Sequence, residues 1–112
     1  FYGNCYNALN DTGILVNQSE STFYSSYADS MKRAHQRLKD LFPVTKIYQA
    51  HIPTYPSGHW LFGFASKKYD PILDLQDKTW NDLGIKTRYY NTELHKGAFA
   101  IPNYVKEQLE YE

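Results

Sequence analysis

A segment with two prolines, residues 52–58 (Ile-Pro-Thr-Tyr-Pro-Ser-Gly), constrains this chain more than any other feature. It lies between two runs of strand-forming residues, 44–52 and 59–66. Each proline holds its own φ at about −65° and favours extended backbone in the residue before it, while Gly58 can take the positive φ of a sharp turn. We therefore expect residues 44–66 to form an antiparallel hairpin whose tip is this segment.

The constrained tip fixes the position of Tyr55. A tyrosine in such a loop can offer a flat apolar face and a hydroxyl to the same ligand, which suits a compound that is partly hydrocarbon and partly polar. A hairpin turn with an aromatic plug is the simpler interpretation, and composition alone favours it over a binding site.

Two elements precede the hairpin. The run Ile14-Leu15-Val16 is typical of a strand buried on both faces of a parallel sheet. A helix should follow from a cap at Ser25 or Ser26 to Phe42, where Pro43 ends it. The apolar residues on one face of this helix are Tyr27, Met31, Ala34, Leu38, Leu41 and Phe42.

The order strand, long helix, strand and returning strand predicts an α/β fold. It indicates the closing part of a Rossmann-like, doubly wound sheet, in which a helical crossover joins parallel strands and the last strand is inserted antiparallel. The opening part of such a sheet, with a glycine-rich turn and an acidic residue about 20 positions later, is absent from these residues. We expect residues 1–112 to be the C-terminal portion of a larger catalytic domain.

Shorter elements complete the prediction. The expected pieces are a helical stripe at 1–9, a turn at 67–71, a partly helical passage at 72–84 with Trp80 and Leu83 as anchors, an extended piece at 85–91, a helix at 93–99 capped by Asn91 or Thr92, and a terminal helix from Pro102 to Glu110.

Length and composition limit the class of protein. The 112 residues allow one small core, and twelve basic residues balance twelve acidic ones, which argues against a nucleic-acid or anionic-membrane surface. Cys5 is the lone cysteine, and neither zinc-ligand spacing nor a long apolar run is present. A reducing, cytoplasmic setting fits these features. Because the chain starts at Phe1 without an initiator Met, we expect it to begin inside a longer protein.

Polar residues follow the first predicted strand. Gln18 and Glu20 come directly after the apolar run. In open α/β sheets, ligands bind outside the carboxyl ends of the strands, so both are candidate binding residues.

Three motifs now occur in a fixed order: Gln-Ser-Glu at 18–20, the proline segment at 52–58, and Tyr-Tyr-Asn-Thr-Glu-Leu-His-Lys-Gly-Ala-Phe-Ala-Ile-Pro at 89–102. Together they resemble the C-terminal portion of spermidine synthase, a polyamine aminopropyltransferase. Gly97 departs from that pattern, because alanine is usual there. The resemblance covers essentially the whole chain.

The resemblance implies a reaction and a fold. Putrescine attacks the aminopropyl carbon of decarboxylated S-adenosylmethionine, a co-substrate, and yields spermidine and methylthioadenosine without a metal or redox cofactor. A small N-terminal β domain would precede a class I methyltransferase-type fold. The catalytic Asp and the donor-binding residues would lie before Phe1, so no catalytic residue is assigned within this chain.

The resemblance also assigns binding roles. Gln18 and Tyr55 would contact the diamine, and Trp60 would line its hydrocarbon chain, although a core aromatic is an equal interpretation. Glu20 would attract the distal ammonium or support Gln18 or the loop. His95 is expected to make structural hydrogen bonds, and His35, His51 and His59 lack the spacing of a ligand set, so satisfied or solvated histidines are expected.

Two alternatives stay open at this level. The chain can be a non-catalytic module that keeps the fold to pair with another subunit, or a relative that methylates putrescine. A truncated sheet exposes a strand edge, so we also expect a homo-oligomer.

Overall fold

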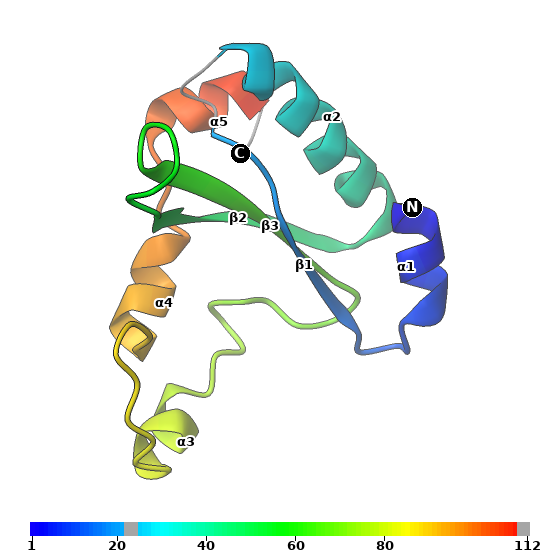
Figure 1. Ribbon diagram of the computed structural model, residues 1–112. Helices are drawn as coiled ribbons and strands as arrows, with labels where there is room; N and C mark the ends of the chain where they lie inside the picture. The colour runs from blue at the N-terminus through cyan, green and yellow to red at the C-terminus, as the bar shows by residue number, and fades with distance from the viewer. Residues whose placement is uncertain (22–24, 110–112) are drawn as a thin grey trace.

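A three-stranded sheet forms the centre of the structure, a computed structural model that describes residues 1–21 and 25–109 (Figure 1). Its strands are β1 (Ile14–Gln18), β2 (Val44–His51) and β3 (His59–Ser66), in the order β1-β3-β2. β3 is antiparallel to both neighbours, so β1 and β2 run parallel to each other. The predicted hairpin and the inserted antiparallel strand are both confirmed.

The register sets what lies at each end of β3. At one end, Ser66 pairs with both Ile14 and Val44, so the three strands are aligned there. At the other end, His59 pairs with His51 at the base of the proline loop.

Helix α2 (Ser25–Leu41) makes the crossover from β1 to β2, and α5 (Asn103–Leu109) packs beside it on the same face of the sheet (Figure 1). Burial of aliphatic side chains between these helices and the sheet supplies the main stabilisation, at about 25 cal/mol per Å² of apolar surface. The core residues are Met31, Ile47, Leu61, Ile101, Val105 and Leu109.

A second, smaller core lies at the C-terminal end of α2. Leu38, Phe42 and Ala65 are buried there, and α1 (Tyr2–Ala8) covers them, with the Tyr6 and Phe42 rings 5.1 Å apart. The predicted N-terminal helix is thus confirmed, but its apolar face was wrong in part: Phe1 and Ala8 of the expected stripe are exposed, and Tyr2, Tyr6 and Leu9 pack at the sheet end opposite the proline loop.

The opposite face of the sheet carries the remaining helices. α3 (Asp77–Asp82) is peripheral, whereas α4 (Thr92–Ala98) packs against β2. The Asn91 side chain caps α4 by accepting the Leu94 N–H at 2.6 Å, as one of the two predicted caps. Residues 85–91 form irregular backbone rather than a strand.

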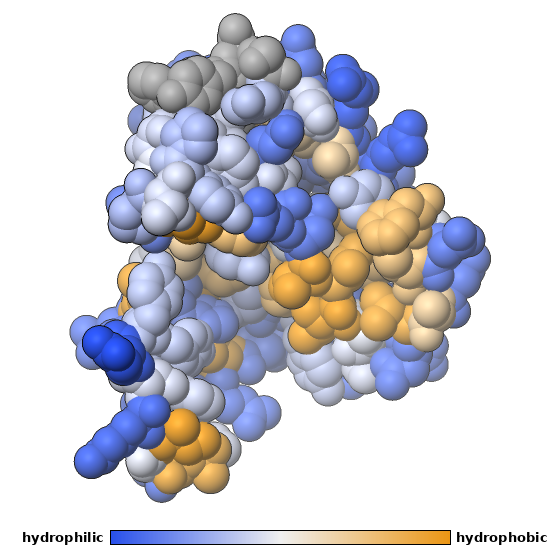
Figure 2. Space-filling view, viewed as in Figure 1, coloured by the Kyte–Doolittle hydropathy of each residue, from blue (hydrophilic) through white to orange (hydrophobic). Residues whose placement is uncertain are grey.

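Some expectations about burial were wrong. In β1, Ile14 and Val16 are 45% and 55% exposed, because α4 packs on their face of the sheet only over β2, whereas Leu15 and Asn17 point to the face that the other helices cover. Figure 2 shows the resulting apolar area over β1 and α1. Leu83 is also exposed, and Trp80 packs on Tyr90 instead, with ring centroids 5.1 Å apart.

The predicted face of α2 is confirmed in part: Met31, Leu38 and Phe42 are buried and Ala34 and Leu41 are half-buried, whereas Tyr27 is exposed. The buried residues of α2 are Ala28, Met31, His35, Leu38 and, just beyond the helix, Phe42. Tyr27 is 38% exposed, and its ring lies 6.5 Å from that of Trp60. The side chains of Ser25 and Ser26, and with them the predicted cap of α2, lie outside the described residues.

Buried His35 makes folding depend on pH. Burial, helped by the positive charge of Lys39, lowers the pKa of His35 from 6.5 to about 4. The unfolded chain therefore binds a proton that the folded chain excludes. As far as His35 is concerned, the free energy of unfolding is highest above pH 6.5 and decreases as the pH falls toward 4. After allowance for partial solvent screening, this amounts to about 2 kcal/mol.

We expect urea denaturation of the wild-type chain at pH 7 and pH 4.5 to show this loss, and His35→Gln to show a smaller difference between the two pH values. Glutamine does not titrate, while the carboxylates are common to both proteins. An equal pH dependence in the two proteins would contradict the assignment to His35.

Gly97, in α4, stands where the resembled motif usually has alanine, and its substitution tests what this glycine does to stability. A Cβ at Gly97 or at Gly84 would meet open space, but only Gly84 has a positive φ, of 63°. Gly97→Ala should raise the free energy of unfolding by about 0.5–1 kcal/mol through helix propensity. Gly84→Ala should lower it by about 1 kcal/mol. Thermal denaturation measures both, and shifts of the same sign would refute this explanation.

Candidate functional site

The proline loop is a closed hydrogen-bonded turn. Ile52 N–H donates to Gly58 O at 2.8 Å, while Tyr55 N–H donates to Ile52 O and Gly58 N–H to Tyr55 O, both at 3.0 Å. Gly58 has the expected positive φ of 70°, and Ser57, unexpectedly, has a φ of 68°. A non-glycine residue in this region costs free energy and is held there by its surroundings. The loop is thus a constrained element.

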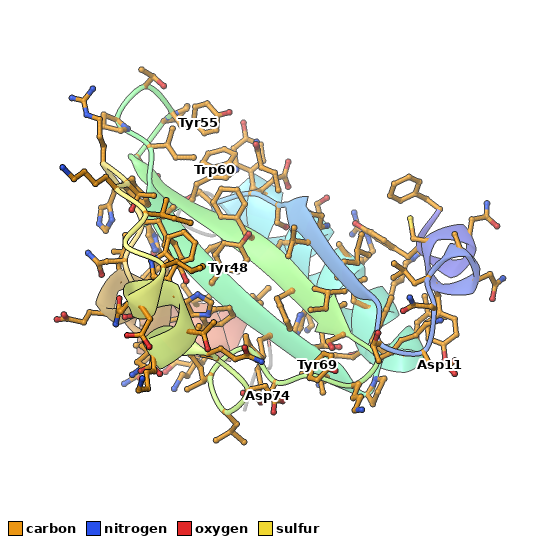
Figure 3. All side chains as sticks on the ribbon, turned by 90° about the horizontal axis from the view of Figure 1, so that it is seen from below. Asp11, Tyr48, Tyr55, Trp60, Tyr69 and Asp74 are labelled. Atoms are coloured by element: carbon orange, nitrogen blue, oxygen red, sulfur yellow. The ribbon has the colours of Figure 1, made fainter. Side chains whose placement is uncertain are left out.

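Trp60 joins this loop to the end of β1. Its indole N–H donates to Ser19 O at 2.8 Å, and its ring meets the Tyr55 ring edge-on, with centroids 5.0 Å apart and an interplanar angle of 74°. Figure 3 shows Tyr55 and Trp60 together at one end of the sheet, with Tyr48 farther along the strands. The structure therefore brings the proline loop next to the Gln-Ser-Glu motif, although Ser19 and Trp60 are 41 positions apart in the sequence.

A second link was not foreseen from the sequence. The hydroxyls of Ser21 and Ser57 lie 3.2 Å apart, so the segment after β1 also contacts the loop through side chains. Tyr27, at the start of α2, adds a third aromatic ring 6.5 Å from that of Trp60. Serines after a strand carry no distinguishing pattern, and a tyrosine on an apolar helical stripe is typical of a core residue, so no sequence signal identified either.

Backbone pairing extends past β1 and fixes Glu20. Ser19 N–H donates to Leu61 O at 3.0 Å, and Leu61 N–H donates to Glu20 O at 3.3 Å. Within the described residues, the Glu20 Oε2 atom is buried and has no hydrogen-bond partner. Burying a carboxylate oxygen without compensation is costly, so this position favours a cationic or hydrogen-bond-donating ligand.

Gln18 is placed less tightly than the other three predicted residues. It is the last residue of β1, pairs with Phe62 and is exposed. The strand end that carries Gln18 continues directly into Ser19 and Glu20, so all four predicted residues lie at the same end of the sheet.

A separate apolar groove of about 340 Å³ contains none of these four residues. It lies between the sheet face opposite α2 and helix α4, and its lining includes Tyr48, Phe64, Tyr90, Leu94, His95 and Phe99. His95 makes the expected hydrogen bonds there, 2.9 Å from Tyr90 Oη through Nδ1 and 2.8 Å from Pro71 O through Nε2. These bonds fasten α4 to the turn after β3.

Two kinds of site are missing from the described residues. Among them, no three His, Cys, Asp or Glu side chains are grouped as a metal site would require. No helix in residues 1–21 and 25–109 has the length and apolar character needed to cross a bilayer. What the end of the sheet offers is an aromatic corner beside a carboxylate.

Comparison with known proteins places this arrangement in a family. The sequence pattern described as "Spermine/spermidine synthase domain" matches residues 1–77. The chain belongs to the spermine/spermidine synthase family. The polyamine aminopropyltransferase of Alkaliphilus oremlandii is 71% identical over 112 residues, and that of Clostridium perfringens (strain ATCC 13124) is 72% identical over 110 residues.

Solved structures agree with this family membership. The spermidine synthase of Thermotoga maritima matches with a TM-score of 0.90 and 38% identity over 99% of the chain. A spermidine synthase in complex with the transition-state analogue AdoDATO matches equally well, with a TM-score of 0.90 and 38% identity. The predicted fold class is therefore confirmed.

The chain spans only part of the family's longer proteins. It covers 39% of the Alkaliphilus relative, 38% of the Clostridium relative and 39% of the Thermotoga chain. The recognition from three sequence motifs is confirmed, while the roles of Gln18, Glu20, Tyr55 and Trp60 remain predictions.

The indole hydrogen bond of Trp60 can be tested by its effect on stability. Trp60→Phe keeps an aromatic ring but leaves Ser19 O without its donor, and we expect the free energy of unfolding to fall by about 1–2 kcal/mol. Trp80→Phe, on peripheral α3, is the matched control and should cost less. Chemical denaturation measures both, and equal costs would show that the bond to Ser19 contributes nothing measurable.

Proposed function

We propose that this chain carries the amine-acceptor side of the active site of a spermidine synthase. The reaction transfers an aminopropyl group from decarboxylated S-adenosylmethionine to putrescine. The observation that carries the proposal is the buried, unpartnered Glu20 oxygen at the end of the sheet that bears Tyr55 and Trp60. Family membership supports it, because the close relatives are named polyamine aminopropyltransferases.

The chemistry of a diamine matches this surface. Putrescine has a cationic or hydrogen-bonding nitrogen at each end and a four-carbon chain between them. Glu20 would pair with the distal ammonium, and the Gln18 side-chain oxygen would accept a hydrogen bond from an amine. The faces of Tyr55 and Trp60 would cover the hydrocarbon, and aromatic faces also attract cations. In this way each kind of atom in the diamine has a partner of suitable polarity.

Transfer requires the reacting amine to be neutral and aligned. Its lone pair forms a bond to the aminopropyl carbon beside the sulfonium, the C–S bond breaks with its electron pair left on sulfur, and the amine nitrogen then loses a proton. The acceptor residues contribute by holding the nitrogen in line, because orientation alone can lower the barrier by several kcal/mol. A carboxylate outside this chain would receive the proton.

We also propose that the other parts of the enzyme lie outside this chain. The donor-binding half, the catalytic Asp and a small N-terminal β domain would belong to the part of the family's longer proteins that this chain does not span. The protein would act in the cytoplasm as a homo-oligomer, with no metal or redox cofactor. Residues 1–112 would be the C-terminal portion of the catalytic domain, inactive without the donor half.

A chimera tests the reaction directly. This chain would replace the matching segment of the Alkaliphilus oremlandii relative, and mass spectrometry would follow spermidine and methylthioadenosine. The unmodified relative is the positive control. Production of N-methylputrescine from S-adenosylmethionine would favour the methyltransferase alternative. A folded chimera that neither turns over nor binds putrescine in calorimetry would favour the non-catalytic module.

Within the chimera, Glu20→Gln should raise the KM for putrescine by about 10- to 100-fold, since it removes the charge opposite an ammonium in a partly buried site. Tyr55→Phe should raise the same KM by a smaller factor, because it removes only the hydroxyl. The KM for the donor should change little.

Asp82→Asn is the matched control for Glu20→Gln. Asp82 lies on peripheral α3, where it pairs with Lys78 in an exposed position. Its substitution should leave both KM values unchanged. If Glu20→Gln behaves in the same way, Glu20 does not bind the diamine.

A further inference from the structure

A hydrogen-bonded cluster lies under the proline loop, on the face of the sheet covered by α5. His59, the first residue of β3, places its Nε2 atom 2.7 Å from Gln49 Oε1 and its Nδ1 atom 3.2 Å from Tyr104 Oη. Gln49 Nε2 in turn donates to Ala100 O at 2.9 Å. The cluster therefore connects the β2–β3 hairpin to residues 100–104, at the start of α5.

The protons in this cluster can be assigned from its partners. Because the Gln49 amide nitrogen donates to a backbone carbonyl, the amide oxygen faces His59 and accepts from Nε2–H. Nδ1 of the neutral ring then accepts from the Tyr104 hydroxyl. Burial, with the neighbouring charge of His51, lowers the pKa of His59 and favours this neutral form. The side-chain nitrogen and oxygen atoms of Gln49 and His59 and the hydroxyl of Tyr104 thus each have one defined role.

His59 is also held from the loop side. The Ser57 hydroxyl lies 3.3 Å from His59 O and 3.4 Å from His59 N, at the point where the loop has left-handed backbone. The residue after His59 is Trp60, whose ring packs against Tyr55. A shift of His59 would therefore move both aromatic residues of the proposed acceptor surface.

We propose that Tyr104, His59 and Gln49 form a positioning clamp through which the C-terminal helix holds the proline loop in its binding geometry. The three residues act through Tyr55 and Trp60 and need not touch the amine. This inference rests on the proposed function for its kinetic consequence. Its structural consequence, the order of Trp60, is independent of any activity.

The kinetic test uses the same chimera and the variant Tyr104→Phe, which keeps the ring and removes the hydroxyl that reaches His59. The KM for putrescine should rise about fivefold, which corresponds to one hydrogen bond of ordinary strength. The KM for the donor should stay unchanged, whereas general destabilisation would affect both substrates. Tyr89→Phe, at an exposed tyrosine, is the matched control and should change neither value.

The structural test is made on the 112-residue chain by itself, with Trp60 as a fluorescent probe. Trp80→Phe removes the other tryptophan, since the chain has two. Tyr104→Phe should raise the acrylamide quenching constant of Trp60 about twofold or more, while Tyr89→Phe leaves it unchanged. Gln49→Met, which removes the other partner of His59, should act in the same direction as Tyr104→Phe.

The two tests separate the clamp from the proposed function. Unchanged quenching together with an unchanged putrescine KM in an active chimera overturns the clamp and leaves the proposed function intact. An inactive, non-binding chimera overturns the proposed function, and the quenching result then decides on the clamp alone.

Discussion

The insertion of β3 between β1 and β2 is the constraint on which the rest of the structure depends. β3 bonds to a neighbour along both edges, so residues far apart in the sequence, such as Gln18 and His51, lie at the same end of one sheet. Ladder pairing continues beyond β1 through Ser19 and Glu20. The end of the sheet is therefore built from three segments whose relative positions are set by backbone hydrogen bonds.

The two faces of this sheet pack against different kinds of side chain. α2 and α5 cover one face and form the aliphatic core around Ile47 and Leu61, each 0% exposed. The other face is aromatic: Tyr48 stacks on Phe62 at 5.2 Å, and Phe99 of the α4 end packs at 5.3 Å from Tyr48. The candidate site occupies the end where both faces meet the proline loop, so the loop depends on packing from each side.

Polar contacts determine how firmly that end is held. The Trp60 indole, the Ser21–Ser57 pair and the His59 cluster tie the loop to β1, to the segment after it and to α5, respectively. Glu20 Oε2 differs from these groups, since it is buried without a partner in the described part of the chain. A buried carboxylate oxygen without a partner, held beside these engaged groups, favours a ligand with positive charge.

The sequence by itself determined the order of the elements, the hairpin, the Asn91 cap and the family, because these depend on local rules: prolines restrict φ, capping side chains bond within one turn, and motifs are read in order. Tertiary structure alone decided which faces are covered. The apolar run at 14–16 was indistinguishable from a doubly buried strand until the packing showed Ile14 and Val16 exposed. It likewise decided the partners of His59 and Ser57, since contacts between residues as distant as His59 and Tyr104 arise only when the chain folds and leave no periodic pattern in the sequence.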